Sequence, residues 1–252
     1  MIDVHAHYED PRFDGDRAEA LAAARAAGVE FIVNCGSSLE SSEAGIRLAA
    51  EHDFVYSCVG IHPHHADDLP PGAMERVEAT LGRPKVVAVG ETGLDYHYDN
   101  SDREAQKRLF KAHLDLAMRR GLPAVIHNRE AHADIMDIIR PLAGKLNAML
   151  HCYSGSAQMA AELVKMGYYF SFGGILTFTN ARVCREAAAA IPLERIMLET
   201  DCPYLSPHPL RGQRNDSSRL PLVLAALAQI KGVSLEEAER VTSANARRFF
   251  GL

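Results

Sequence analysis

The 252-residue sequence lacks the features that define several large classes of protein. Its longest nearly uninterrupted apolar run, residues 220–230, is far shorter than the roughly 18 to 20 residues that a membrane-spanning helix needs. The chain does not open with a basic segment followed by an apolar stretch and a cleavage site, so no secretory signal is predicted. Acidic side chains outnumber basic ones, 33 to 27, for a formal net charge of −6. We therefore expect a cytoplasmic protein with no membrane association. The negative net charge also differs from the overall basic charge that is common in nucleic-acid-binding proteins.

Cysteine is scarce and scattered. The five cysteines stand singly, without a CxxC pair, and their odd number cannot be bridged completely within one chain. We therefore expect reduced thiols. Cys152 and Cys202 adjoin residues identified below as metal ligands, but a small buried apolar side chain is the simpler explanation for both.

The chain also shows no linker, low-complexity tract or internal repeat. Its composition, with 47% hydrophobic and 24% charged residues, is ordinary for a folded domain and excludes disordered, collagen-like and coiled-coil proteins. We expect one domain over residues 1–252.

Short apolar runs alternate with longer segments in which apolar residues recur every three or four positions, as in repeated strand–helix units. The predicted strands are residues 2–4, 30–33, 55–59, 86–89, 124–126, 148–150, 168–172 and 196–198. The predicted helices between them are residues 14–27, 39–51, 73–81, 104–120, 131–139, 156–166 and 180–190. Three of these helices end at a glycine (Gly28, Gly121 or Gly167), the usual residue after a helix.

Eight such units in about 250 residues predict an α/β fold, a single-domain (β/α)8 TIM barrel. Residues 219–252 carry no strand pattern and predict two or three extra C-terminal helices. An open doubly wound sheet is the alternative, but the GxGxxG turn that would follow its first strand is missing.

Histidines and carboxylates gather at the ends of the predicted strands. These residues are His5, His7, His62, His64, Glu91, His127, His151 and Asp201. In a barrel these strand ends share one face, where the following loops build the active site. His5 and His7 are two positions apart, so on an extended chain both imidazoles point to the same side and can hold one cation. Donors converging from several strands predict a metal centre, in which mixed nitrogen and oxygen ligands suit zinc, manganese, nickel, iron or magnesium.

Several motifs occur in a fixed order along almost the whole chain. They are residues 2–7 (IDVHAH), 10–13 (DPRF), 60–64 (GIHPH), 90–96 (GETGLDY), 127–129 (HNR), 151–155 (HCYSG), 199–205 (ETDCPYL) and 211–215 (RGQRN). Together they resemble the TatD-type metal-dependent hydrolases of the amidohydrolase superfamily. One departure is that this family usually continues the last motif with Glu-Pro, whereas here Asp216 and Ser217 follow.

The resemblance implies a TIM barrel that binds one or two divalent metal ions (Mg, Mn or Zn) and hydrolyses phosphodiester bonds in DNA, often from the 3′ end. It also implies that His5, His7 and Asp201 bind one cation and that His127 and His151 bind the second. Glu91 would bridge the two cations.

The expected catalytic residues are Asp201, Glu91 and His62, with Asp201 as the general base. A bound cation promotes the hydrolysis in two ways. It lowers the pKa of the water that it binds, and it offsets the negative phosphoryl charge that repels a nucleophile. The expected substrate-binding residues are His62, His64, Arg129, Arg211, Arg214 and Asn215. The alternatives for these residues are structural: histidines that orient ligands, an arginine salt bridge, or a solvated loop. Asp3, Asp95 and Glu199 are expected to hydrogen-bond ligand imidazoles.

Three functional hypotheses follow. The first is a metal-dependent deoxyribonuclease, a 3′–5′ exonuclease with DNA as substrate, acting as a monomer without an obligate protein partner. The second is an amidohydrolase-type enzyme that uses the same metal site on an amide, lactone or aminoacyl ester, because the ligands alone do not distinguish phosphorus from carbon. The third is a binding protein that kept the barrel and lost turnover, which the presence of all six expected ligands argues against.

Overall fold

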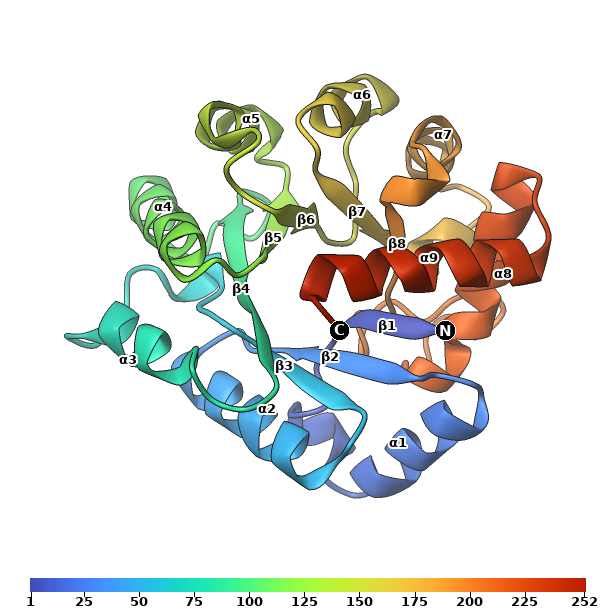
Figure 1. Cartoon of the computed structure of the whole chain (residues 1–252), viewed down its shortest axis with the longest axis horizontal. Helices are drawn as coiled ribbons and strands as arrows, with labels where there is room; N and C mark the ends of the chain where they lie inside the picture. Colours follow the sequence, from blue (N-terminus) through green and yellow to red (C-terminus); the bar gives the residue numbers. More distant parts are fainter. The chain divides into compact units, whose positions relative to one another are not determined.

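The computed structural model describes residues 1–252, and its eight strands form one sheet in chain order, β1 to β8 (Figure 1). The strands are β1 (Ile2–Ala6), β2 (Phe31–Cys35), β3 (Val55–Val59), β4 (Val86–Asp95), β5 (Ala124–Arg129), β6 (Ala148–Leu150), β7 (Tyr169–Phe172) and β8 (Ile196–Leu198). The helices are α1 (Arg17–Ala26), α2 (Leu39–Glu51), α3 (Ala73–Thr80), α4 (Arg103–Arg120), α5 (His132–Ile139), α6 (Ala157–Lys165), α7 (Arg182–Ala190), α8 (Leu220–Lys231) and α9 (Leu235–Phe250).

The sheet has the topology of a (β/α)8 barrel. Neighbouring strands pair in parallel, as β1 does with β2 and β4 with β5. The chain beyond the last strand also returns to the first, because Ala6 forms a parallel bridge with Cys202 just after β8. A helix follows each strand, and α9 is additional, which confirms the predicted fold class and the extra helical segment at the C-terminus.

Strand ends differ most from the sequence prediction at β4. The predicted strand ends at Val89, whereas the observed strand continues through Gly90 and Gly93 to Asp95. At Gly93 the backbone has φ of +150°, and a Cβ atom would lie 1.9 Å from the backbone oxygen of His127 in β5. Glycine is therefore what allows β4 to lie this close to β5.

The longer strands change the positions of three expected ligands. His5, Glu91 and His127 lie inside β1, β4 and β5, not beyond them as predicted. The helix ends match the prediction better, since Gly28, Gly121 and Gly167 follow α1, α4 and α6 with positive φ.

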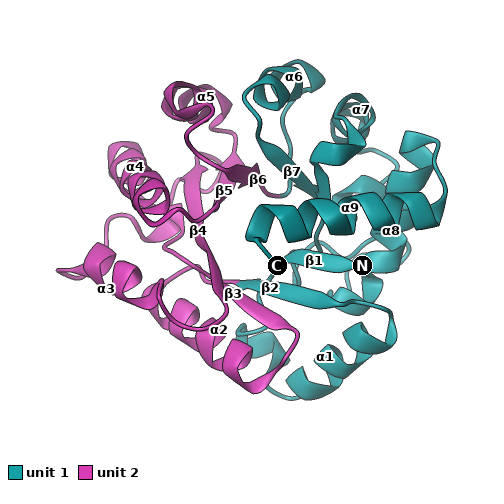
Figure 2. Ribbon diagram, in the orientation of Figure 1, with its two compact units in different colours: residues 1–34, 152–252 teal, residues 35–151 magenta.

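Contacts divide the chain into two compact units (Figure 2). Unit 1 contains residues 1–34 and 152–252, and unit 2 contains residues 35–151. Aromatic side chains fill much of the core of unit 1, where Tyr8 stacks on Phe13 with ring centroids 4.7 Å apart. In unit 2 the fully buried side chains include Ile61, Leu94 and Phe110. One domain over residues 1–252 stays a prediction.

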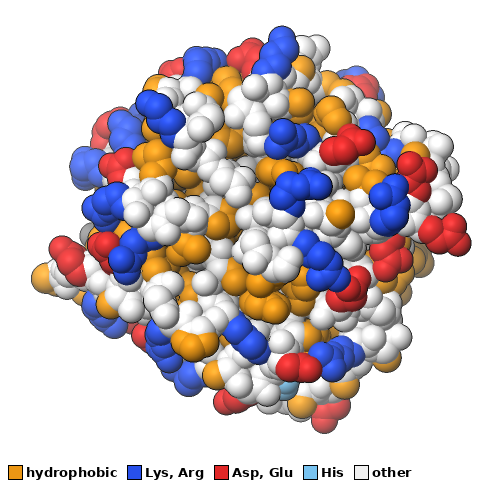
Figure 3. Space-filling view, in the orientation of Figure 1, with side chains coloured by type: hydrophobic (Ala, Val, Ile, Leu, Met, Phe, Trp, Pro, Cys, Tyr) orange, Lys and Arg blue, Asp and Glu red, His pale blue; other side chains and the backbone are white.

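The C-terminal helices belong to unit 1. Asn245 of α9 is buried, and its amide nitrogen donates to the backbone oxygens of Leu193 and Ile196, both at 2.8 Å, at the start of β8. No single helix is long and apolar enough to cross a membrane; the segments Ser217–Lys231 and Leu235–Phe250 meet that test only as a pair bent by 106°. Acidic and basic side chains both occur across the face in Figure 3.

Candidate metal centre

In unit 1, His5, His7 and Asp201 place their donor atoms within 4.8 Å of one another. The Nε2 atoms of the two histidines are 3.1 Å apart, and Oδ1 of Asp201 lies 3.4 Å from Nε2 of His7 and 3.7 Å from that of His5. Backbone hydrogen bonds hold the two segments together, since Asp201 N–H donates to His5 and His7 N–H donates to Cys202. Asp201 itself has φ of +55°, an uncommon conformation for a residue other than glycine.

Asp3 connects the two segments of this group through hydrogen bonds. Its buried carboxylate accepts hydrogen bonds from the backbone and hydroxyl of Thr200, from the hydroxyl of Ser217 and from the backbone of His5. Burial raises the pKa of Asp3 to about 6, although the hydrogen bonds from Ser217 and Thr200 oppose this shift. The expected role in orienting His5 is indirect, because Asp3 contacts its backbone and not its imidazole.

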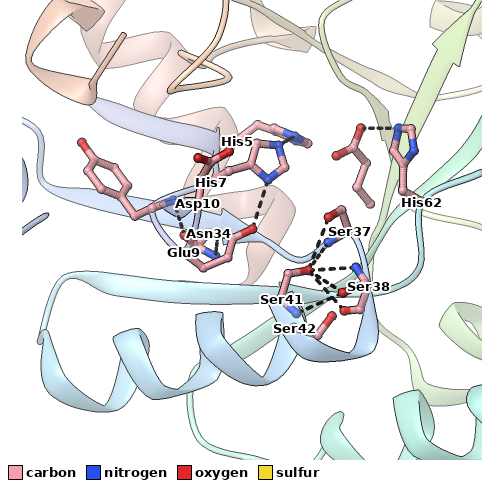
Figure 4. A network of polar contacts seen from close by, with 12 residues as sticks. His5, His7, Glu9, Asp10, Asn34, Ser37, Ser38, Ser41, Ser42 and His62 are labelled. Carbon is pink, nitrogen blue, oxygen red and sulfur yellow. Dashed lines mark hydrogen bonds and ion pairs between the residues drawn. The ribbon is translucent and has the colours of Figure 1, made fainter. Parts of the chain in front are cut away.

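A second carboxylate orients His7 (Figure 4). Glu9 lies 3.5 Å from Nδ1 of His7 and accepts a hydrogen bond of 2.8 Å from the side chain of Asn34. Asn34 is fully buried and in turn accepts from the backbone of Tyr8. Glu9 was not among the predicted site residues, although it continues the alternation of His5 and His7 by two further positions.

In unit 2, Glu91, His127 and His151 form a comparable group. Oε1 of Glu91 lies 2.9 Å from Nδ1 of His127 and 2.8 Å from Nε2 of His151. The same two imidazole nitrogens are 3.1 Å apart. Glu91 and His151 are buried, so the three polar side chains meet in a place with little contact with solvent.

Asp95, His62 and His64 extend this group. Oδ2 of Asp95 lies 3.1 Å from Nε2 of His127 and 3.1 Å from Nε2 of His64, and Nε2 of His62 lies 3.5 Å from Glu91. Burial alone would lower the pKa of His127, but the hydrogen bonds with Asp95 and Glu91 raise it to about 9. Burial and the neighbouring His127 instead hold the pKa of His62 well below its usual value. Asp95 was expected only to orient a ligand, yet it also shares a possible ligand group with His62 and His127.

The donor geometry in both units suits a divalent cation. Metal–nitrogen bonds of about 2.0 to 2.1 Å place two ligands on one ion roughly 3 Å apart. The paired imidazole nitrogens, at 3.1 Å in each unit, have this separation. The residues present therefore fit a divalent cation in each unit.

The expected substrate-binding arginines lie in different surroundings. The guanidinium of Arg129 lies 4.6 Å from the ring centroid of Tyr98, and that of Arg211 lies 4.3 Å from the ring centroid of Phe178. Arg214 is held by two hydrogen bonds of 2.6 Å to the carboxylate of Asp16. The guanidinium of Arg214 is therefore occupied by a salt bridge within the protein.

Asn215 supports the protein backbone. Its side chain is fully buried, donates to the backbone oxygen of Thr200 and accepts from the backbone of Asp216. The expected contact of Asn215 with substrate therefore finds no support, because both of its polar groups already bind the loop that follows β8.

The sequence model of the TatD-related DNase family matches residues 2–251 of this chain. The chain belongs to the TatD-related DNase family. It is 38% identical over 251 residues to a protein of Bacillus subtilis described as the uncharacterized metal-dependent hydrolase YabD, covering 99% of this chain and 98% of the relative. It is also 34% identical over 258 residues to the 3′-5′ ssDNA/RNA exonuclease TatD of Klebsiella pneumoniae, covering 100% of this chain and 98% of the relative.

Solved structures agree with this TatD family assignment. The TatD homologue YjjV of Escherichia coli superposes with a TM-score of 0.94 at 30% identity, covering 100% of this chain and 98% of that structure. A β-aspartyl dipeptidase of Fervidobacterium islandicum has a TM-score of 0.65 at 16% identity, covering 100% of this chain and 74% of that structure, and shows the fold alone. The TatD family membership makes this chain a metal-dependent hydrolase, as the sequence motifs predict.

Proposed function

We propose that this protein is a metal-dependent exonuclease that hydrolyses phosphodiester bonds in DNA from the 3′ end. The observation that carries the proposal is the pair of histidine–carboxylate groups in a chain of the TatD-related DNase family. The names of relatives such as the 3′-5′ ssDNA/RNA exonuclease of Klebsiella pneumoniae support single-stranded nucleic acid as the substrate class.

His5, His7 and Asp201 would hold one divalent cation, and His127 and His151 a second, with Glu91 as a further ligand. Mg, Mn or Zn is the proposed metal. When bound, a divalent cation supplies Lewis acid chemistry, lowering the pKa of water and offsetting negative charge on the phosphoryl oxygens. Bridging of two cations by Glu91 stays a prediction.

The protein's own side chains then handle the proton and the substrate. Asp201 is the proposed general base, because its carboxylate is partly exposed and faces the two imidazoles of its group. His62 is buried beside Glu91, and burial and the neighbouring His127 lower its pKa, so the ring is neutral. Its Nδ1 accepts from the backbone N–H of His64, which leaves the ring proton on Nε2, where it can donate a hydrogen bond to substrate. We assign His64 the same contact with substrate or leaving group.

Exposed tyrosines beside each group favour nucleic acid over a small carbonyl substrate. Tyr98 is 56% exposed, and its ring centroid lies 5.5 Å from that of His64, with Arg129 over its face. Tyr204 is 45% exposed, 6.1 Å from the ring of His7. Aromatic rings paired with cations are typical of sites that stack bases and contact phosphates of single strands.

We further propose that residues 1–252 act as one domain and as a monomer, with Arg129 and Arg211 as the arginines that contact the nucleic-acid backbone. The cytoplasmic location expected from the sequence stays a prediction.

The proposal is tested with 3′- and 5′-end-labelled single-stranded DNA, incubated with purified protein and added magnesium, manganese or zinc. We expect metal-dependent release of mononucleotides, and a loss of about 10²- to 10⁴-fold in Asp201→Asn, since general-base catalysis contributes about that much. Glu91→Gln should lose activity together with bound metal, measured by elemental analysis. Glu130→Gln is the matched control, because that exposed carboxylate lies beside His97 and outside both groups.

A second panel of amides, lactones and aminoacyl esters distinguishes the amidohydrolase hypothesis. Metal-loaded protein that cleaves one of these and leaves DNA intact would refute the nuclease proposal. Protein that binds no metal after removal and readdition would favour the non-catalytic hypothesis instead.

A further inference from the structure

A cavity of about 410 Å³ opens in unit 1 at the ends of two strands. Its walls come from the segment after β6, the segment after β7 and the first turn of α7. The residues that line the cavity include Tyr153, Phe172, Gly173, Asn180, Arg182 and Val183. None of them belongs to the metal groups described above.

The cavity lies beside the metal group of unit 1. Gly173 forms one wall, and a Cβ atom on it would lie 3.3 Å from Cγ of Glu199. A carboxylate oxygen of Glu199 lies within 4.8 Å of a ring nitrogen of His5. Only the side chain of Glu199 therefore lies between this wall and a proposed metal ligand, so the cavity and the metal group of unit 1 are close neighbours.

The walls suit a flat, mostly apolar group. The rings of Tyr153 and Phe172 lie edge to face with centroids 6.2 Å apart, and both side chains are buried. The hydroxyl of Tyr153 donates to the backbone oxygen of Ser156, which fixes the orientation of its ring. A cavity of this size falls in the range of small-ligand sites, which combine apolar walls with a few polar groups.

The rim is polar and exposed. Val183 is 45% exposed at the mouth, and the side chain of Arg182, beside it, is 79% exposed and forms a salt bridge of 2.9 Å with Glu186 in the next turn of α7. Asn180 is also exposed and offers an amide, which can donate and accept hydrogen bonds at the edge of a ring. The combination of buried aromatic walls, an amide and an exposed, salt-bridged arginine at the rim matches a nucleobase at the end of a nucleic-acid strand.

We propose that this cavity binds the nucleobase of the nucleotide that is being released, next to the bond that is cut. The proposal rests on the proposed nuclease function. It makes the base, and not only the phosphate, part of what the enzyme recognises.

The first test compares an oligonucleotide that ends in a normal 3′ nucleotide with one that ends in an abasic residue. Stacking of one base is expected to make kcat/KM about 5- to 150-fold higher for the normal end. Val183→Trp should fill the mouth and bring this ratio close to one, leaving cleavage of the abasic end unchanged. Leu235→Trp is the matched control, because Leu235 is 54% exposed and also lies in the first turn of a helix, α9.

The unchanged rate on the abasic end shows that the variant is folded and active. Equal rates for the two ends in the wild type, or a ratio that Val183→Trp leaves intact, would overturn the proposal while DNA cleavage itself continued. Absence of cleavage at either end would instead count against the nuclease function.

A second test needs no turnover. Cys152 and Cys184 line the cavity and are partly exposed, whereas Cys35, Cys58 and Cys202 are buried. A deoxynucleoside 5′-monophosphate should slow alkylation of the two cavity thiols, measured by mass spectrometry, and Val183→Trp should abolish this protection. Unprotected thiols at saturating nucleotide would refute base binding in the cavity.

Discussion

At the scale of single residues, His113 shows how the interior keeps an ionisable side chain neutral. It is fully buried in α4, where Nδ1 donates to the backbone oxygen of Leu109 and Nε2 accepts from the backbone N–H of Ile61. A second ring proton would break the bond to Ile61. Burial lowers the pKa of His113 to about 4, and the hydrogen bond to Leu109 only partly opposes this shift.

This pKa predicts acid sensitivity. Because the folded pKa lies below the unfolded value of about 6.5, the unfolded chain binds the extra proton first as pH falls. The stability associated with neutral His113 is therefore complete above about pH 6.5 and is lost toward pH 4, by about 3 kcal/mol. In urea unfolding, the free energy of unfolding should fall less between pH 6.5 and pH 4 for His113→Gln than for the wild type. An unchanged slope in His113→Gln would contradict the prediction, and the exposed His208→Gln should behave like the wild type.

Residue identity and position suffice to predict the candidate metal ligands, since alternation and strand ends are visible in the sequence. The sequence does not show which hydrogen-bond partners lie far away along the chain. Arg214 was expected to contact substrate, but it binds Asp16, 198 positions away. Asn215 was expected beside substrate, but it is buried against Thr200. A polar side chain in a loop has the same sequence signature whether it binds a ligand or the protein itself.

At the scale of elements, the carboxyl end of β4 determines where two proposed metal ligands, Glu91 and His127, lie. Register pairs Gly93 with His127 across β4 and β5, so the ligand backbone is in contact with the glycine. The sequence predicts this strand but not its length, because glycine usually weakens strands and signals a turn. Only the close approach of the neighbouring strand explains why glycine belongs there.

Gly93→Ala is therefore expected to displace His127. Its Cβ atom would meet the backbone oxygen at 1.9 Å, and we expect a loss of at least about 4 kcal/mol in stability together with weaker metal binding. Gly121→Ala is the matched control, because Gly121 also has positive φ but open space around it, and should cost about 1 to 2 kcal/mol with metal affinity unchanged. Urea unfolding measures the stability of each variant, and zinc titration measures its metal affinity. Equal losses in the two variants would show that the contact with His127 is unimportant.

At the scale of the whole molecule, the alternation of strands and helices was enough to predict the barrel topology. The donor groups should make stability depend on metal, because an ion that binds only the folded state stabilises it by about 2.7 kcal/mol at a hundred times its dissociation constant. For a chain of this length we expect chelation to lower Tm by roughly 5 to 10 °C, reversed by adding metal back. Scanning calorimetry with and without chelator measures the shift. The double variant His5→Ala, His127→Ala should show none, and a shift that persisted in it would indicate binding elsewhere.

The ligands of the two groups also differ in how far apart they stand along the chain. Glu91, His127 and His151 lie within one continuous segment, residues 35–151, whereas His5 and His7 need Asp201. During synthesis the ribosome therefore releases every ligand of one group while the other still has only its two histidines. The imidazoles made first are the last to acquire their carboxylate, so a nascent chain stalled before residue 201 would carry one complete set of metal donors and one incomplete set.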